Sequence, residues 1–259
     1  MKKIWLSIAF VLVFFVSCST NAVDEGKEVE LIISAAASLM GVMEEIKNDF
    51  ETIHDDILLT FNFAGSGSLA QQIQSGAPVD LYISANQEWM NTLADNEWIQ
   101  PDSRINVAHN QIVLVKKSKL DYESSMTFVG LSEIEELQIA IGDPATVSAG
   151  FFAKQVFEEL GIWTNLKDKL VYGKDVQQVR TYVETDSVDY GVLFLSDTIV
   201  TDEIEVLDVA LSSWHDPIVY PAAITSHTEN VEAARTFLNF IASEAIEDVW
   251  IEYGFNQKH

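Results

Sequence analysis

The sequence predicts an α/β protein with two lobes, each a sheet flanked by helices, and three observations support this. Short apolar strands alternate with amphipathic helices along the chain, a pattern typical of sheets covered by helices. The chain has 259 residues, 48% of them apolar, which is enough to build two modest cores. Two apolar strands, at 111–117 and 218–225, enclose a second α/β set. We therefore expect the chain to leave a first lobe and return to it through two crossover strands that act as a hinge.

The first α/β set begins with the apolar stretch VELIISAA at 29–36, which reads as a buried strand. Apolar residues then recur at helical spacing as far as Phe50. A short helix up to Ser75 is followed by Gly76 and Pro78, which are common after a helix end. Ser84 and Gln87 have the spacing of a capping box for the helix that follows. Two further strands are expected at 57–64 and 80–85.

The second α/β set lies between the two crossover strands and repeats the same alternation. Beyond it, the segment from 229 is expected to form a long helix and then a second helix that ends in YGF. We place the first lobe at 29–108 plus 219–259 and the second at 109–218. The second set comprises expected strands at 138–143, 170–173 and 190–196 and expected helices at 149–160 and 175–185.

The N-terminal segment has the features of an export signal. Two lysines precede a short apolar run, so 1–17 is expected to be a signal peptide. The sequence FVSC that ends at Cys18 is similar to a bacterial lipobox, in which the cysteine receives a lipid, although Phe15 stands where leucine is usual. The polar residues 18–28 would then be a tether. An ordinary secretory signal with a chance cysteine is the alternative. Either form is exported, to the periplasm or the cell surface.

The composition excludes several kinds of partner. The chain has 15 basic and 40 acidic residues, a formal charge of −25. Removal of 1–17 would leave 13 basic residues and a charge of −27. Such a field repels nucleic acid and anionic lipid surfaces. Cys18 is the only cysteine, so no disulfide can form within one chain.

Four strand–turn–helix junctions rich in small residues carry the candidate binding chemistry. Their helices begin near Ser38, Ser66, Ala149 and Val176. The start of a helix offers unpaired N–H groups and the positive end of a dipole, where anions bind. Each junction alone is explained by helix capping. FAGSGSLA at 63–70 lacks the Gly-Lys-Ser/Thr of a P-loop, so the argument depends on the four junctions acting together.

In combination and in order, these motifs resemble those of the periplasmic molybdate-binding proteins that serve ABC transporters. The similarity spans nearly all of the chain after the signal. It is carried by AAASL at 35–39, FAGSGSLAQQIQSGAPVDLYISANQEWM at 63–90, GDPATVSAG at 142–150, GKDV at 173–176, GVLFLSD at 191–197 and YGF at 253–255. The resemblance implies a type II periplasmic-binding-protein fold.

The resemblance also implies a site in which uncharged donors hold an oxyanion. By position, Ser38 and Ser66 would each give a hydroxyl and an N–H group, and Ala149 and Val176 would give N–H groups. The metal would enter only as molybdate, with no protein atom bound to it and no cofactor. The family usually adds a tyrosine hydroxyl where this chain has Phe194. Possible substitutes are Tyr190, four residues earlier, and Ser148, where the family often has proline.

The implied function is capture of molybdate or tungstate between the lobes and delivery to an ABC permease driven by its ATPase. The implied form is a monomer held at the membrane by a lipid on Cys18. Another oxyanion, such as sulfate or phosphate, is the first alternative, because Phe194 departs from the family. An enzyme with a serine nucleophile and a histidine base is the second, but none of the five histidines follows a catalytic signature. A surface adhesin, suggested by six tryptophans, is the third.

Overall fold

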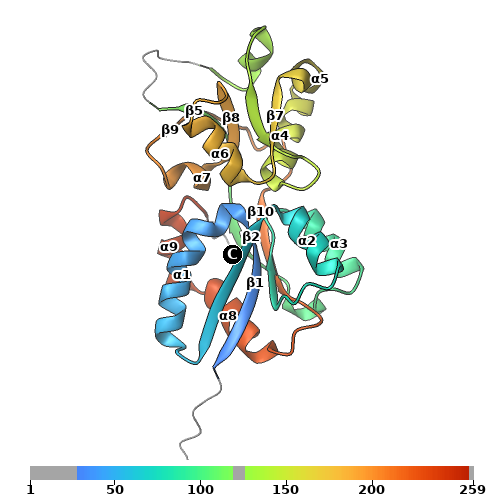
Figure 1. Ribbon diagram of the computed structural model, residues 1–259, viewed down its shortest axis with the longest axis vertical. Coiled ribbons are helices and arrows are strands. Elements are labelled where there is room, and N and C mark those ends of the chain that lie inside the picture. The colour runs from blue at the N-terminus through green and yellow to red at the C-terminus, as the bar shows by residue number, and fades with distance from the viewer. Residues whose placement is uncertain (1–27, 119–125, 257–259) are drawn as a thin grey trace, which may run out of the picture.

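The computed structural model describes residues 28–118 and 126–256, and this part of the chain forms two five-stranded sheets (Figure 1). We call the sheet ordered β2-β1-β3-β10-β4 and its helices lobe I, and the sheet ordered β7-β6-β8-β5-β9 and its helices lobe II. The two-lobed α/β fold predicted from the sequence is confirmed. The chain enters lobe II after β4 (Ile105–His109) at β5 (Ile112–Lys117). It returns after β9 (Ile204–Val209) at β10 (Val219–Ile224).

In lobe I, three strands run parallel and place their carboxyl ends at one edge of the sheet. β1 (Val29–Ala36) lies between β2 (Ile57–Ala64) and β3 (Leu81–Ile83), and β10 runs antiparallel to β3. The helices of this lobe in chain order are η1 (Ala37–Leu39), α1 (Met40–Ile53), α2 (Ser66–Gln74), α3 (Gln87–Asp95), η2 (Pro101–Ser103), α8 (Val231–Ile241), η5 (Glu244–Ile246) and α9 (Glu247–Glu252).

Lobe II repeats this arrangement with its own parallel set. β6 (Ile139–Gly142) is parallel to β7 (Leu170–Gly173) and to β8 (Tyr190–Phe194), whereas β5 is antiparallel to β8 and β9. The helices are η3 (Val129–Glu133), α4 (Ser148–Glu159), α5 (Trp163–Leu166), η4 (Lys167–Lys169), α6 (Val176–Glu184) and α7 (Leu195–Ile199).

Apolar burial explains why these segments form and where they pack. Val42, Met43, Ile46 and Phe50 lie on one face of α1 and are at most 1% exposed. The Phe50 ring packs edge-on against Phe237 of α8, with the ring centroids 5.1 Å apart. The core therefore joins α1 and α8, although these helices are far apart in the sequence.

The structure differs from the sequence-based expectations at one helix cap and in two strands. The capping box of Ser84 and Gln87 is wrong, because Asn86 caps α3 by accepting a hydrogen bond from the Glu88 N–H (2.6 Å). Ser84 Oγ instead donates to the Asn86 carbonyl. β4 and β9 were not predicted from the sequence. The lobe boundaries at 29–108 plus 219–259 and 109–218 stay a prediction; the strands of each sheet fall within them except for His109, the last residue of β4.

The predicted signal peptide 1–17 and Cys18 lie outside the described residues, as does the tether 18–28 except for its last residue. Within 28–118 and 126–256, none of the helices has the length and apolar character required to cross a bilayer.

Candidate functional site

All four predicted junctions meet at one small cavity between the lobes. Lobe I contributes the end of β1 and the starts of η1 and α2, and lobe II contributes the starts of α4 and α6 and the end of β8. These are the carboxyl edges of the two parallel sets, where open α/β sheets bind ligands. The lining residues are Ala36, Ala37, Ser38, Ala64, Gly65, Ser66, Ala85, Val147, Ser148, Ala149, Val176 and Phe194.

The structure therefore brings together six of the seven residues singled out in the sequence. Ser66, Ser148, Ala149 and Val176 are at most 3% exposed, and Ser38 is 8% exposed. Tyr190 does not line this cavity. The volume of this cavity is only about 10 Å³. The candidate donors thus converge on a very small volume.

Ser66 is arranged to donate its hydroxyl hydrogen. Its Oγ accepts a hydrogen bond from the Ala85 N–H at 3.0 Å, and the Tyr82 hydroxyl donates to the Ser66 carbonyl at 2.8 Å. Because its oxygen already has a donor, the Ser66 hydroxyl hydrogen is free to point elsewhere. Because Ser66 lines the cavity, its hydroxyl can donate a hydrogen bond to an acceptor bound there.

Ser38 has a partner that the sequence did not reveal. Its Oγ lies 3.0 Å from the Tyr220 hydroxyl oxygen, and Asn110 Nδ2 lies 3.1 Å from that same oxygen. Burial, followed by the negative charge of Asp197, raises the pKa of Tyr220 well above its usual value. Tyr220 therefore stays a neutral hydroxyl beside Ser38. The one local signal was a tyrosine in an apolar strand, since a buried tyrosine hydroxyl needs a partner.

Ser148 supplies a third hydroxyl without a protein partner. Its Oγ is fully buried and makes no hydrogen bond in the structure. A buried hydroxyl without a partner costs free energy unless something binds to it. The Phe194 side chain has no N–H or O–H group to donate, and its ring packs against Phe152 and Tyr220 at centroid distances of 6.3 and 5.9 Å. The structure thus places a free hydroxyl at Ser148, one of the two substitutes considered from the sequence.

Backbone N–H groups complete the donor set. Ala149 is the second residue of α4, and Val176 is the first residue of α6. N–H groups in these positions have no acceptor within their own helix and lie at the positive end of its dipole. The Asp175 side chain caps α6 by accepting from Gln178 N–H, which leaves the N–H of Val176 outside that bond. The cavity is therefore rich in donors.

Direct contacts hold the two lobes together around the cavity. The Gly67 N–H donates to the Thr146 carbonyl at 2.9 Å, and Gln177 Nε2 donates to the Ala37 carbonyl at 3.1 Å. A Cβ atom added to Gly65 would lie 2.7 Å from the Thr146 oxygen, closer than real Cβ contacts. The lobes thus meet backbone to backbone, and a glycine at 65 is needed for that approach.

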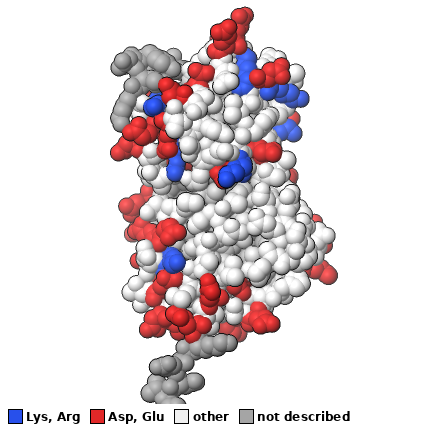
Figure 2. All heavy atoms as spheres, in the orientation of Figure 1, with Lys and Arg blue, Asp and Glu red and all other residues white. Residues whose placement is uncertain are grey.

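None of the residues that line the cavity is basic. Acidic side chains are spread over the visible face of both lobes, with few basic ones among them (Figure 2). A bound anion would therefore be held by neutral hydrogen-bond donors at short range, and not by lysine or arginine. Among the described residues there is also no group of three histidine, cysteine, aspartate or glutamate side chains that could hold a metal ion.

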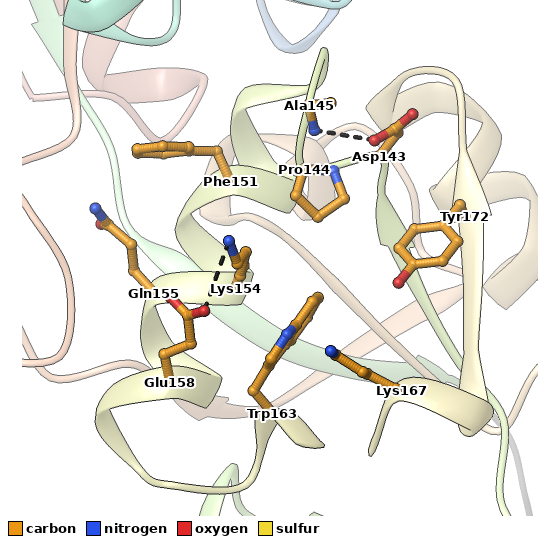
Figure 3. A pocket seen from close by; sticks show the side chains of 10 residues that line it. All are labelled: Asp143, Pro144, Ala145, Phe151, Lys154, Gln155, Glu158, Trp163, Lys167 and Tyr172. Atoms are coloured by element: carbon orange, nitrogen blue, oxygen red, sulfur yellow. Dashed lines mark hydrogen bonds and ion pairs between the residues drawn. The ribbon is translucent and has the colours of Figure 1, made fainter. Parts of the chain in front are cut away.

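A much larger pocket lies elsewhere and is built by lobe II alone (Figure 3). Its volume is about 740 Å³, and it has no lining residue in common with the small cavity. Lys154 pairs with Glu158 at 3.5 Å and lies 5.9 Å from the Trp163 ring. Figure 3 shows Trp163 between Lys154 and Lys167. Helix N-termini do not converge on this pocket as they do on the small cavity. We therefore place the site at the small cavity, although the pocket is larger.

Asp197 is a buried carboxyl group next to the site. It lines a second cavity of about 140 Å³, and Ser38 and Arg180 line the same cavity. Burial raises the pKa of Asp197 from 3.8 to about 7, although the Phe194 N–H and Arg180 favour the charged form. Between these two values the folded protein keeps a proton that the unfolded chain releases. The free energy of unfolding therefore falls as pH rises from about 4 to 7.

We expect Asp197→Asn to remove this fall, which is on the order of 4 kcal/mol at 1.36 kcal/mol per pKa unit. The variant should be more stable than wild type at pH 8, and its free energy of unfolding should rise less than that of wild type as the pH is lowered. Urea unfolding of both proteins between pH 4.5 and 8 measures the difference. Asp95→Asn, at an exposed position at the end of α3, controls for the lost charge. Parallel pH profiles of wild type and Asp197→Asn would contradict the expectation.

Comparison with known proteins agrees with this geometry. A family model described as bacterial extracellular solute-binding protein matches residues 31–256. A Bacillus subtilis (strain 168) protein, provisionally named an ABC transporter substrate-binding lipoprotein, is 38% identical over 95% of this chain and 94% of its own. The molybdate-binding protein ModA of Haemophilus influenzae is 29% identical over 88% of this chain and 91% of its own.

Solved structures show the same fold. The substrate-binding domain of a provisionally named molybdenum ABC transporter from Clostridium difficile is 35% identical, with a TM-score of 0.68 over 89% of this chain and all of that one. The Azotobacter vinelandii periplasmic molybdate-binding protein is 21% identical, with a TM-score of 0.77 over 88% of this chain and all of that one. The fold is that of type II periplasmic binding proteins. The chain therefore belongs to the family of bacterial extracellular solute-binding proteins.

Proposed function

We propose that this protein captures molybdate or tungstate in the cavity between its lobes and delivers it to an ABC transporter permease. Its family consists of extracytoplasmic binding proteins of transporters and not of enzymes, so the serines act as ligand donors and not as nucleophiles. The observation that carries the proposal is the convergence of three buried serines and the N-terminal ends of α4 and α6 on one cavity without a basic side chain. Relatives named as molybdate-binding proteins support the choice of ion.

The donor set suits a fully deprotonated oxyanion. A buried dianion is costly unless its oxygens are hydrogen-bonded, and rigid N–H and O–H groups supply such bonds. A fixed cage of donors also measures size, because a smaller ion leaves some donors unpaired at about 1–3 kcal/mol each. Sulfate and phosphate are smaller than molybdate and tungstate. A protonated phosphate has the further disadvantage that its O–H group meets donors and not acceptors.

The remaining parts of the proposal concern delivery. The ion bridges Ser38 and Ser66 of lobe I to Ala149 and Val176 of lobe II and so stabilises the closed arrangement. The closed monomer docks on a permease whose ATPase drives transport. Residues 1–17 direct export, and a lipid on Cys18 holds the protein by the tether 18–28 at the membrane, in the periplasm or on the cell surface.

Sulfate or phosphate remains the second candidate because Phe194 supplies no hydroxyl. Calorimetric titration of residues 19–259 with molybdate, tungstate, sulfate and phosphate separates the candidates. The proposal expects tight one-to-one binding of molybdate and tungstate and far weaker binding of sulfate. Equal binding of sulfate, or binding of none of the four, would contradict it.

Ser148→Ala tests the third hydroxyl. We expect molybdate to bind about ten- to a hundredfold more weakly, because one hydrogen bond to a charged group contributes about 1.5–3 kcal/mol. Folding stability should not fall, since the Ser148 hydroxyl has no protein partner to lose. Ser34→Ala is the matched control, because Ser34 is also a buried serine without a partner but does not line the cavity. Equal losses of affinity in the two variants would exclude a direct role for Ser148.

A further inference from the structure

A chain of hydrogen bonds connects Ser38 to the first crossover between the lobes. Asn110 lies between β4 and β5, Tyr220 lies on β10, and Ser38 lies in η1. Asn110 Nδ2 is 3.1 Å from the Tyr220 hydroxyl, which is 3.0 Å from Ser38 Oγ. All three side chains are at most 8% exposed. Water therefore has little access to this chain of polar groups.

One backbone group fixes the orientation of the Asn110 amide, from which the direction of its bond to Tyr220 follows. The Gln111 N–H can only donate, and it lies 2.8 Å from Asn110 Oδ1, which fixes the orientation of the amide. Asn110 Nδ2 must then donate to the Tyr220 hydroxyl. The Tyr220 oxygen then already accepts from Asn110, and Ser38 Oγ, 3.0 Å away, is an acceptor within reach of its one hydroxyl hydrogen, so we assign Tyr220 as the donor and Ser38 as the acceptor. The hydrogen of Ser38 is left to point away from Tyr220.

Neighbouring groups keep this arrangement in place. The rings of Phe194 and Phe255 flank Tyr220 at centroid distances of 5.9 and 5.4 Å and offer its hydroxyl no competing acceptor. Tyr220 also stays neutral, for the reasons of burial given above. The second hydrogen of Asn110 Nδ2 goes to Ser196 Oγ of α7, at 2.8 Å. The same amide therefore contacts a residue of lobe I and a residue of lobe II.

We propose that Asn110 and Tyr220 are positioning residues that fix the Ser38 hydroxyl as a hydrogen-bond donor to the bound oxyanion. The proposal rests on the function proposed above. Neither side chain lines the cavity, so both act through Ser38. Because Asn110 also holds Ser196, the donor direction of Ser38 is set by a network that includes both lobes. Without the Tyr220 hydroxyl, the Ser38 hydroxyl would rotate freely in the unbound protein. It would lose that freedom when the ion binds, which weakens binding.

A double-mutant cycle with Tyr220→Phe and Ser38→Ala tests this mechanism. Tyr220→Phe should weaken molybdate binding about tenfold, as expected for one ordered hydrogen bond. In the Ser38→Ala background the same substitution should have no further effect on affinity, because the hydroxyl through which it acts is gone. Tyr182→Phe, at a half-buried position in α6, is the control and should bind as wild type does. Circular dichroism and thermal unfolding establish that each variant is folded.

The possible results separate the two proposals. If wild type binds molybdate and Tyr220→Phe binds it equally well, the positioning role is wrong and the proposed function stands. If Tyr220→Phe costs the same factor with and without Ser38, Tyr220 acts by general packing and the proposal is overturned. Should wild type bind none of the four oxyanions, the proposed function fails, and the positioning role fails with it. Loss confined to the background that has Ser38 supports the proposal.

Discussion

Gly65→Ala is expected to fold as wild type does and to bind molybdate at least about a hundredfold more weakly. Gly65 has φ −61° and ψ 137°, a conformation open to alanine, so the substitution adds no backbone strain. The added Cβ would lie 2.7 Å from the Thr146 oxygen of the other lobe. Because that oxygen is backbone, the contact is relieved only if the lobes move apart.

Separation of the lobes removes the donors that only lobe II can give. An ion seated on Ser38 and Ser66 would then bond poorly to Ala149 and Val176. Two weakened bonds to a charged ligand, at about 1.5–3 kcal/mol each, give a loss of a hundredfold or more. The same carbonyl of Thr146 accepts the Gly67 N–H bond across the lobes, so the closed arrangement loses that contact too.

Calorimetry and small-angle scattering together measure this effect. Wild type should become more compact when molybdate is added, and Gly65→Ala should not. Gly130→Ala is the matched control, since a Cβ there meets only flexible side-chain atoms of Met126 and Thr127. Wild-type affinity in Gly65→Ala would show that the contact with Thr146 does not limit closure. A large drop in its unfolding temperature would place the contact in folding instead.

The candidate site was predictable as far as it depends on local sequence. Ser38 and Ser66 each lie in the first turn of a helix that follows a strand, and a turn of this kind depends on neighbouring residues. Parallel strands then bring such junctions to one edge of a sheet. Strands with long apolar runs, such as β1 and β2, were predicted with their observed bounds. β9 was not, because only Ile204 of its six residues is buried and its sequence lacks an apolar run.

The contacts of Ser38 could not be predicted in this way. Tyr220 is 182 residues from Ser38, and Asn110 is 110 residues from Tyr220, so only the folded topology brings them together. The raised pKa of Asp197 has the same origin, since its burial depends on how α7 packs against α6, β8 and β9. Local sequence therefore predicted which groups can donate to an anion. It did not predict the residues that orient those groups.

Gly150→Ala should reduce folding stability as well as molybdate binding, whereas Gly65→Ala should reduce binding alone. Gly150 is the third residue of α4, and a Cβ there would lie 1.9 Å from the oxygen of Gly142 at the end of β6. Both groups belong to the core of lobe II, so the helix start must move away from the strand. Overpacking of this kind costs about 3 kcal/mol. For a chain of this size that corresponds to a fall in unfolding temperature of roughly 6–12 °C.

Binding should fall with stability in this variant because the displaced segment contains Ser148 and the N–H of Ala149. Thermal unfolding without ligand, followed by titration with molybdate below the transition, measures the two effects separately. Gly130→Ala serves again as the control for a glycine-to-alanine change in lobe II. If Gly150→Ala kept the wild-type unfolding temperature but lost binding, α4 would be free to shift without cost. The close packing of α4 on β6 would then have no role in stability, and the rigidity of the donor cage would need another cause.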